Sequence, residues 1–83
     1  MSYKCVCCGY YTLKHNNELE HEICPVCFWE NDSIQNSQPD YSGGANKISL
    51  NEAKENYKVY GAIMKEYIKY VRAPYDEERN TNT

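Results

Sequence analysis

Cysteines are the residues of this chain with the clearest chemistry. Cys5, Cys8, Cys24 and Cys27 form two C-x2-C pairs separated by fifteen residues. Each pair makes a tight turn, or knuckle, in which two thiolates converge, and two knuckles complete a tetrahedral site with Zn–S distances of about 2.3 Å. The spacing therefore predicts one Zn(II) per chain. A site with four protein ligands is structural, because a catalytic zinc keeps one position open; the ligands alone leave iron as an alternative metal.

The fifth cysteine, Cys7, lies inside the first pair. We expect its side chain to point away from the metal defined by Cys5 and Cys8. Three roles stay open for it: a half-buried structural thiol, a reactive redox thiol, or an alternative ligand that replaces a neighbour. His15 and His21 lie between the pairs, and since four thiolates leave no vacancy, we expect surface or structural roles for both.

The size and charge of the chain limit its function. A chain of 83 residues buries only about 60 to 65% of its unfolded surface, so it needs a staple such as a metal. Four thiolates and one Zn(II) together add a charge of −2, which brings the chain from −3 to −5. This charge disfavours nucleic acid, which is bound by neutralising phosphates, and favours a basic protein partner.

Other signals in the sequence are negative. The first residues, "MSYKCVCC", lack the pattern of a signal peptide, and no segment has the roughly 18 apolar residues that span a bilayer. We therefore expect a cytoplasmic protein that does not enter the membrane, with reduced cysteines. The sequence contains no Ser/His/Asp order, phosphate-binding glycine loop or HExxH motif, so we expect a protein that is not an enzyme.

The sequence predicts a small α+β fold with one zinc-stapled domain over residues 1–77. Residues 1–30 contain the two knuckles, 31–48 are a polar loop, 49–72 are helical, and 78–83 form a flexible tail. A short β-hairpin is expected to join the knuckles, as in a zinc ribbon. Its strands would use β-formers on either side of "NN", namely Tyr10, Thr12 and Leu13, then Leu19, His21 and Ile23.

The C-terminal helix has a clear start and end. Ser49 and Glu52 have the spacing of a capping box, and Pro74 stops the helix. Apolar residues recur at spacings of three and four and form an amphipathic stripe, which we expect to pack on the cysteine module or to dock a partner: Leu50, Ala53, Tyr57, Tyr60, Met64, Tyr67 and Val71. Gly61 lies within this pattern, and the sequence leaves open whether the helix breaks there.

Three longer motifs resemble the small bacterial cysteine-rich proteins of the CPCC family. They are "CVCCGY" at 5–10, "EICPVCFWEND" at 22–32 and "QPDYSGGANKISLNEAKENY" at 38–57. Val6 and Ala73 replace prolines of the family pattern, but no ligand is lost. The resemblance implies Zn(II) binding by the four paired cysteines.

The resemblance also implies that residues around the second knuckle and in the loop form a fixed surface: Phe28, Trp29, Asp40, Tyr41, Gly43, Gly44 and Asn46. In one interpretation these residues are structural, with Phe28 and Trp29 packed between the knuckle and the helix. In the other they are an exposed recognition edge, in which Trp29 and Tyr41 are anchors and Phe28 and Asp40 complete the partner-binding set.

Our preferred hypothesis is a non-enzymatic zinc protein that acts as a protein-interaction module, such as an immunity or antitoxin-like inhibitor of a basic effector. The first alternative is a nucleic-acid-binding zinc ribbon that uses the lysines of 49–72. The second is a thiol redox or metal-handling protein that uses Cys7. The sequence does not identify the partner or the oligomeric state.

Overall fold

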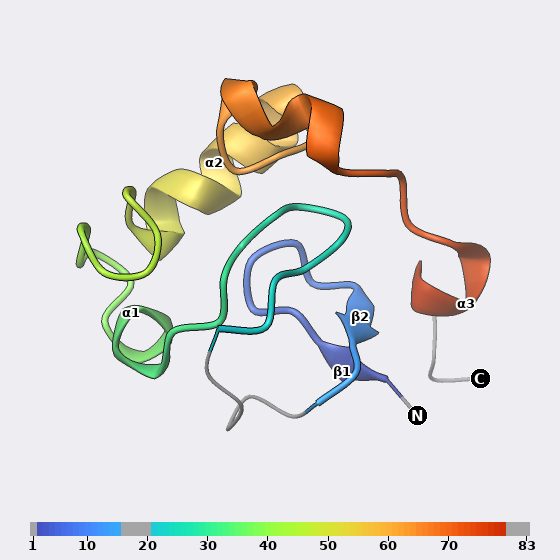
Figure 1. Ribbon diagram of the computed structural model, residues 1–83, viewed down its shortest axis with the longest axis horizontal. Coiled ribbons are helices and arrows are strands. Elements are labelled where there is room, and N and C mark those ends of the chain that lie inside the picture. The colour runs from blue at the N-terminus through green and yellow to red at the C-terminus, as the bar shows by residue number, and fades with distance from the viewer. Residues whose placement is uncertain (1, 16–20, 80–83) are drawn as a thin grey trace.

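The computed structural model describes residues 2–15 and 21–79, and its elements surround the two knuckles (Figure 1). The strands β1 (Tyr3–Lys4) and β2 (Tyr11–Leu13) pair antiparallel, with Tyr3 opposite Leu13 and Lys4 opposite Tyr11. They form a hairpin around the first knuckle. The sequence predicted a hairpin between the knuckles instead, with strands around Thr12 and His21.

That predicted pairing is wrong for the described residues, because the second half of the linker bonds elsewhere. Ile23 forms an isolated antiparallel bridge with Glu30, and the N–H of His21 donates to the carbonyl of Asn31. Each knuckle is therefore closed by its own flanking segments. Leu19, which was assigned to the second strand, lies outside the described residues.

The segment predicted as a loop, residues 31–48, contains the short helix α1 (Ser33–Ser37). Asp32 caps this helix by accepting hydrogen bonds from the N–H groups of Ile34 and Gln35. The sequence analysis missed this helix because "NDSIQNS" is too short and polar to show an apolar period. Its start signal was nevertheless present, since Asp is a preferred N-cap residue.

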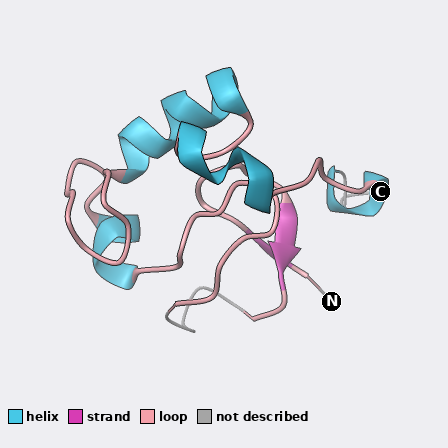
Figure 2. Cartoon of the chain, turned by 45° about the horizontal axis from the view of Figure 1, so that its top comes forward, coloured by secondary structure: helices cyan, strands magenta, loops and turns pink. Residues whose placement is uncertain are grey.

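The helix α2 (Leu50–Tyr60) begins as predicted, with the Ser49 hydroxyl accepting from the N–H of Glu52 at 3.1 Å. It ends at Gly61, whose φ of 78° is the left-handed C-cap conformation. The chain then folds back as the 3₁₀ helix η1 (Lys65–Tyr70), which lies beside α2 in both views (Figures 1 and 2). The helical region thus breaks at Gly61.

The C-terminal segment returns to the first hairpin through α3 (Asp76–Arg79), which packs near β2 (Figure 1). Arg72 and Glu78 form a bidentate ion pair with distances of 2.8 and 2.9 Å. The hydrogen bonds from Arg72 hold the pKa of Glu78 below its ordinary value. Glu78 and Arg79 were expected in a flexible tail but belong to this helix, and residues 80–83 lie outside the described part.

Helices cover one side of the knuckles and enclose a thin core. Among the described residues the buried hydrophobic set consists of Cys5, Cys7, Leu13, Cys24, Val26, Cys27, Trp29, Leu50, Ala53, Ala62 and Ile63. Four of these eleven are cysteines, so sulfur occupies the place that aliphatic side chains fill in larger domains. In α2 only Leu50 and Ala53 are buried. These first two residues of the predicted amphipathic stripe belong to the same core cluster as the buried cysteines.

A second, polar core lies under the loop that precedes α2. Gln35 has no exposed surface, and its amide nitrogen donates to the carbonyls of Tyr41, Asn46 and Ile48, each at 3.1 Å. Its side-chain oxygen accepts from both nitrogens of Asn46. The N–H of Ala45 donates to Asp32 and is the main reason that the pKa of this carboxyl lies below its usual value.

Replacing Gln35 tests the polar core. Gln35→Met keeps the volume but leaves one buried and two part-buried carbonyls and the Asn46 donors without their partner, so we expect a loss of about 3 kcal/mol in the free energy of unfolding. Urea denaturation of the metal-loaded protein measures it. Gln38→Met is the control, because Gln38 is exposed, and it should change stability by less than about 0.5 kcal/mol. Equal losses in the two variants would contradict the assignment.

Candidate metal centre

The two knuckles have the same backbone geometry. In the first, the N–H of Gly9 donates to the carbonyl of Cys5 at 2.9 Å; in the second, the N–H of Phe28 donates to the carbonyl of Cys24 at 2.9 Å. Gly9 and Phe28 also have matching positive φ angles of 83° and 77°. The C-x2-C pairs therefore present their sulfurs in the same way, from opposite sides of one site.

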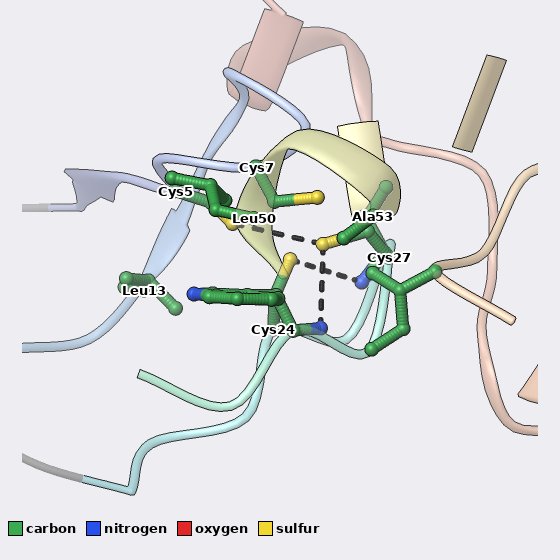
Figure 3. Packing of buried hydrophobic residues seen from close by; sticks show 10 residues of the cluster. Cys5, Cys7, Leu13, Cys24, Cys27, Leu50 and Ala53 are labelled. Atoms are coloured by element: carbon green, nitrogen blue, oxygen red, sulfur yellow. Dashed lines mark hydrogen bonds between the residues drawn. The ribbon is translucent and has the colours of Figure 1, made fainter. Parts of the chain in front are cut away.

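The sulfurs of Cys5, Cys8, Cys24 and Cys27 all lie within 4.8 Å of one another. The Sγ atoms of Cys5 and Cys27 are 3.6 Å apart, and those of Cys8 and Cys24 are 3.8 Å apart. In a regular tetrahedron with metal–sulfur distances of about 2.3 Å, the sulfurs are about 3.8 Å apart. The spacing thus fits one ion bound by four sulfurs, and Figure 3 shows three of the contributing cysteines together in the core.

Further donors lie around the sulfurs. The N–H of Val26 points to Cys24 Sγ and that of Trp29 to Cys27 Sγ, both at 3.4 Å, and the Thr12 hydroxyl lies 3.0 Å from Cys24 Sγ. Such contacts stabilise thiolate charge and orient the ligands. From the sequence Thr12 was predicted only as a strand residue, and its position on a strand next to a knuckle was the available signal.

The sulfurs are electrostatically coupled. The hydrogen bond with Cys24 is the largest factor that raises the pKa of Cys27, while the same contact lowers the pKa of Cys24. Cys8 also has a raised pKa, mainly through Cys24. Four sulfurs at this separation cannot all be thiolates unless a cation shares the site, and a divalent metal ion meets that requirement.

Cys7 is buried next to the tetrad, with 8% of its surface exposed. Figure 3 shows its side chain within the buried cluster, near those of Cys5 and Cys27. The group of four sulfurs within 4.8 Å of one another does not include that of Cys7, so among the described residues Cys7 lies outside the candidate ligand set. Its burial favours the structural role over the reactive one, because reactive thiols are accessible.

The two histidines contact carboxylates and not the tetrad. His15 lies 3.4 Å from Glu22, and His21 lies 2.9 Å from Glu30. Both side chains are mostly exposed, which agrees with the surface roles expected for them.

The four candidate partner-binding residues separate into two groups. Trp29 is buried, and its indole N–H donates to Asn36 Oδ1 at 3.0 Å, which agrees with the structural interpretation of this residue and not with the interface-anchor interpretation. Phe28 is half-buried with its ring 4.6 Å from that of Tyr67. Asp40 and Tyr41 are exposed, and Asp40 accepts a hydrogen bond from Asn51.

The comparison with known families agrees with this arrangement. The sequence profile of the family described as cysteine-rich CPCC matches residues 3–78, which include both knuckles, the loop, α1, α2, η1 and all of α3 except Arg79. The chain belongs to the cysteine-rich CPCC family. No curated protein matches this member of the family. None of the helices in its described part has the length and apolar character needed to span a membrane.

The left-handed turn after the first knuckle can be tested at Gly9. A Cβ atom added there meets nothing within 4 Å, so Gly9→Ala should cost only the backbone strain of about 1 to 2 kcal/mol. Gly9→Asn is the matched control, since Asn tolerates this conformation better, and it should recover about half of the loss. Urea unfolding of the zinc-loaded variants gives both values. An alanine variant as stable as the parent would disprove the strained turn.

Proposed function

We propose that this CPCC-family chain is a non-enzymatic, cytoplasmic, structural-zinc protein that acts as a protein-interaction module. The observation that carries the proposal is the tetrad itself: four sulfurs at tetrahedral spacing supply every ligand a zinc ion takes in a structural site. Cys5 and Cys8 would hold the ion from one side, and Cys24 and Cys27 from the other. When bound, the zinc supplies a cross-link between the two knuckles.

The interaction role is supported by the loop that follows α1. Residues 38–45 are all exposed, yet the buried side chains of Gln35 and Asp32 hold their backbone from inside by bonding to the carbonyl of Tyr41 and the N–H of Ala45. A preorganised exposed loop loses little conformational entropy when a partner binds. Tyr41 lies on this loop with 45% of its surface exposed, and tyrosine is enriched among the residues that dominate interfaces.

The charge of the chain supports a basic partner. Its net charge is −3 before the metal site is counted, and complementary charge speeds association and selects partners. An immunity or antitoxin-like protein that neutralises a basic effector fits this size and charge. We propose this role in its general form, an acidic module that occupies a basic protein surface.

The two alternative functions have weaker support. Lysines of α2 and η1 alternate with acidic residues, and Lys58 pairs with Glu55 at 3.1 Å, so the helices offer no continuous basic face for nucleic acid. The thiol-redox hypothesis needs an accessible Cys7, which is buried.

Metal stoichiometry tests the zinc part of the proposal. Native mass spectrometry with metal analysis should find one zinc per chain, because the tetrad offers one tetrahedral site. Cys24→Ser should lose most of the metal. Cys7→Ser is the matched control at a buried cysteine outside the tetrad, and it should retain one zinc. Iron in the parent, or equal loss of zinc from both variants, would contradict the assignment.

Partner capture tests the interaction part. The zinc-loaded chain, used as bait in an extract of its native host, should retain a specific protein with a basic surface. Tyr41→Ala should reduce that retention by at least about tenfold if Tyr41 is an interface anchor. Val59→Ala is the control, because Val59 is exposed on α2 and outside the loop. Recovery of no specific protein would end this proposal.

A further inference from the structure

A small pocket lies where the second knuckle, the loop before α2 and the segment after Gly61 meet. Its volume is about 110 Å³, and its lining consists of Phe28, Glu30, Ala45, Asn46, Lys47, Ile63 and Tyr67. These residues are far apart in the sequence, and the sequence analysis did not group them. They do not include any member of the cysteine tetrad, so the pocket is a separate site.

The walls of the pocket are held in place by buried polar contacts. The N–H of Glu30 donates to Asn46 Oδ1 at 2.9 Å, and Asn46 Nδ2 donates to the carbonyl of Glu30 at 2.8 Å. Asn46 is buried, and Gln35 holds it in turn through two further bonds. On the third side, the N–H of Ile63 donates to the carbonyl of Cys27 at 2.9 Å. The pocket is therefore built before any occupant arrives.

The volume limits the occupant. Sites for small-molecule ligands usually measure about 300 to 1,000 Å³, and this pocket is about a third of the lower limit. It is too small for a nucleotide or a cofactor. A single amino-acid side chain from a partner protein fits a space of this size.

The lining offers one acidic side chain, one basic side chain and two aromatic rings to that side chain. The acidic side chain is that of Glu30, which is 30% exposed and whose Oε2 lies 2.9 Å from Nδ1 of His21. The rings of Phe28 and Tyr67 lie 4.6 Å apart beside it, and aromatic faces attract cations. Lys47 is the opposing charge. It is exposed, and its long, flexible side chain can extend into solvent.

We propose that this pocket receives one lysine or arginine side chain of a protein partner. The inference rests on the proposed interaction function and specifies how it would recognise a basic surface. Glu30 pairs with the cationic group of the entering side chain, and the rings of Phe28 and Tyr67 contact the aliphatic stem and the charged end of that side chain. Lys47 reduces the affinity because it carries the same charge as the occupant. The pocket adjoins the exposed loop, so a partner surface that contacts Tyr41 can place a basic side chain here.

Titration of the isolated chain with a small probe tests the pocket without the partner. The probe is N-acetyl-lysine methylamide, added to the zinc-loaded, ¹⁵N-labelled protein and followed by NMR. We expect saturable shifts of the Glu30, Asn46 and Lys47 amides. N-acetyl-norleucine methylamide has a similar stem without the charge, and its binding should be weaker by about two- to fivefold. No saturable shift up to about 50 mM lysine probe would overturn the proposal, since such binding is too weak to contribute to an interface.

Two charge variants make the test specific. Glu30→Gln should raise the dissociation constant for the lysine probe by about two- to fivefold, and Lys47→Gln should lower it by a similar factor. Glu66→Gln is the control, because it removes the same charge at an exposed position of η1, and it should leave the constant unchanged. Reversed signs would overturn the proposal and indicate an acidic occupant. Equal effects of Glu30→Gln and Glu66→Gln would overturn it in favour of attraction by net charge alone.

The two proposals can fail separately. If the lysine probe does not bind but the bait still retains a protein in a Tyr41-dependent way, the pocket inference fails and the interaction function stands. If the probe binds and the bait retains nothing, the pocket remains a cation site and the interaction function fails.

Discussion

The convergence of four sulfurs on one point is the constraint on which the rest of this structure depends. Cys5, Cys24 and Cys27 are among the most buried residues of the described chain, so the metal site and the hydrophobic core are the same region. Leu50 and Ala53 of α2 pack on it. A chain of this size cannot obtain enough stability from its few aliphatic residues alone, and four thiols this close need a cation to be ionised together.

The polar core under the loop has a different role. Gln35, Asp32 and Asn46 place many hydrogen bonds beneath a segment that is exposed along its length. Buried polar networks with every group satisfied rigidify the backbone that they hold. In this chain these hydrogen bonds hold the exposed loop that carries Tyr41. They also hold Asn46, which forms one wall of the pocket beside Glu30. The cysteine core is the candidate metal site, and the polar core shapes the surface that we propose meets a partner.

The sequence predicted the features that depend on local chemistry. Cysteine spacing indicated the tetrad and Ser49 the start of α2, while Gly61 marked a position at which the sequence left a break open. The sequence failed where long-range pairing decides the structure, because β2 pairs with β1 and not with the linker near His21. For Trp29 the sequence left two interpretations open, and its burial and its hydrogen bond to Asn36 favour the structural one. The pocket was not predictable, because Glu30, Lys47 and Tyr67 meet only after the chain has folded.

The dependence of the fold on the metal is the central claim, and the amide NMR spectrum of the zinc-loaded chain before and after chelation tests it most directly. We expect that removal of the ion changes the dispersed amide spectrum to that of an unfolded chain, for the amides of both the knuckles and α2. Added zinc should restore the dispersed spectrum. This follows because the ligands form part of the core and binding energy becomes folding energy. A spectrum that stays dispersed without metal would contradict the claim.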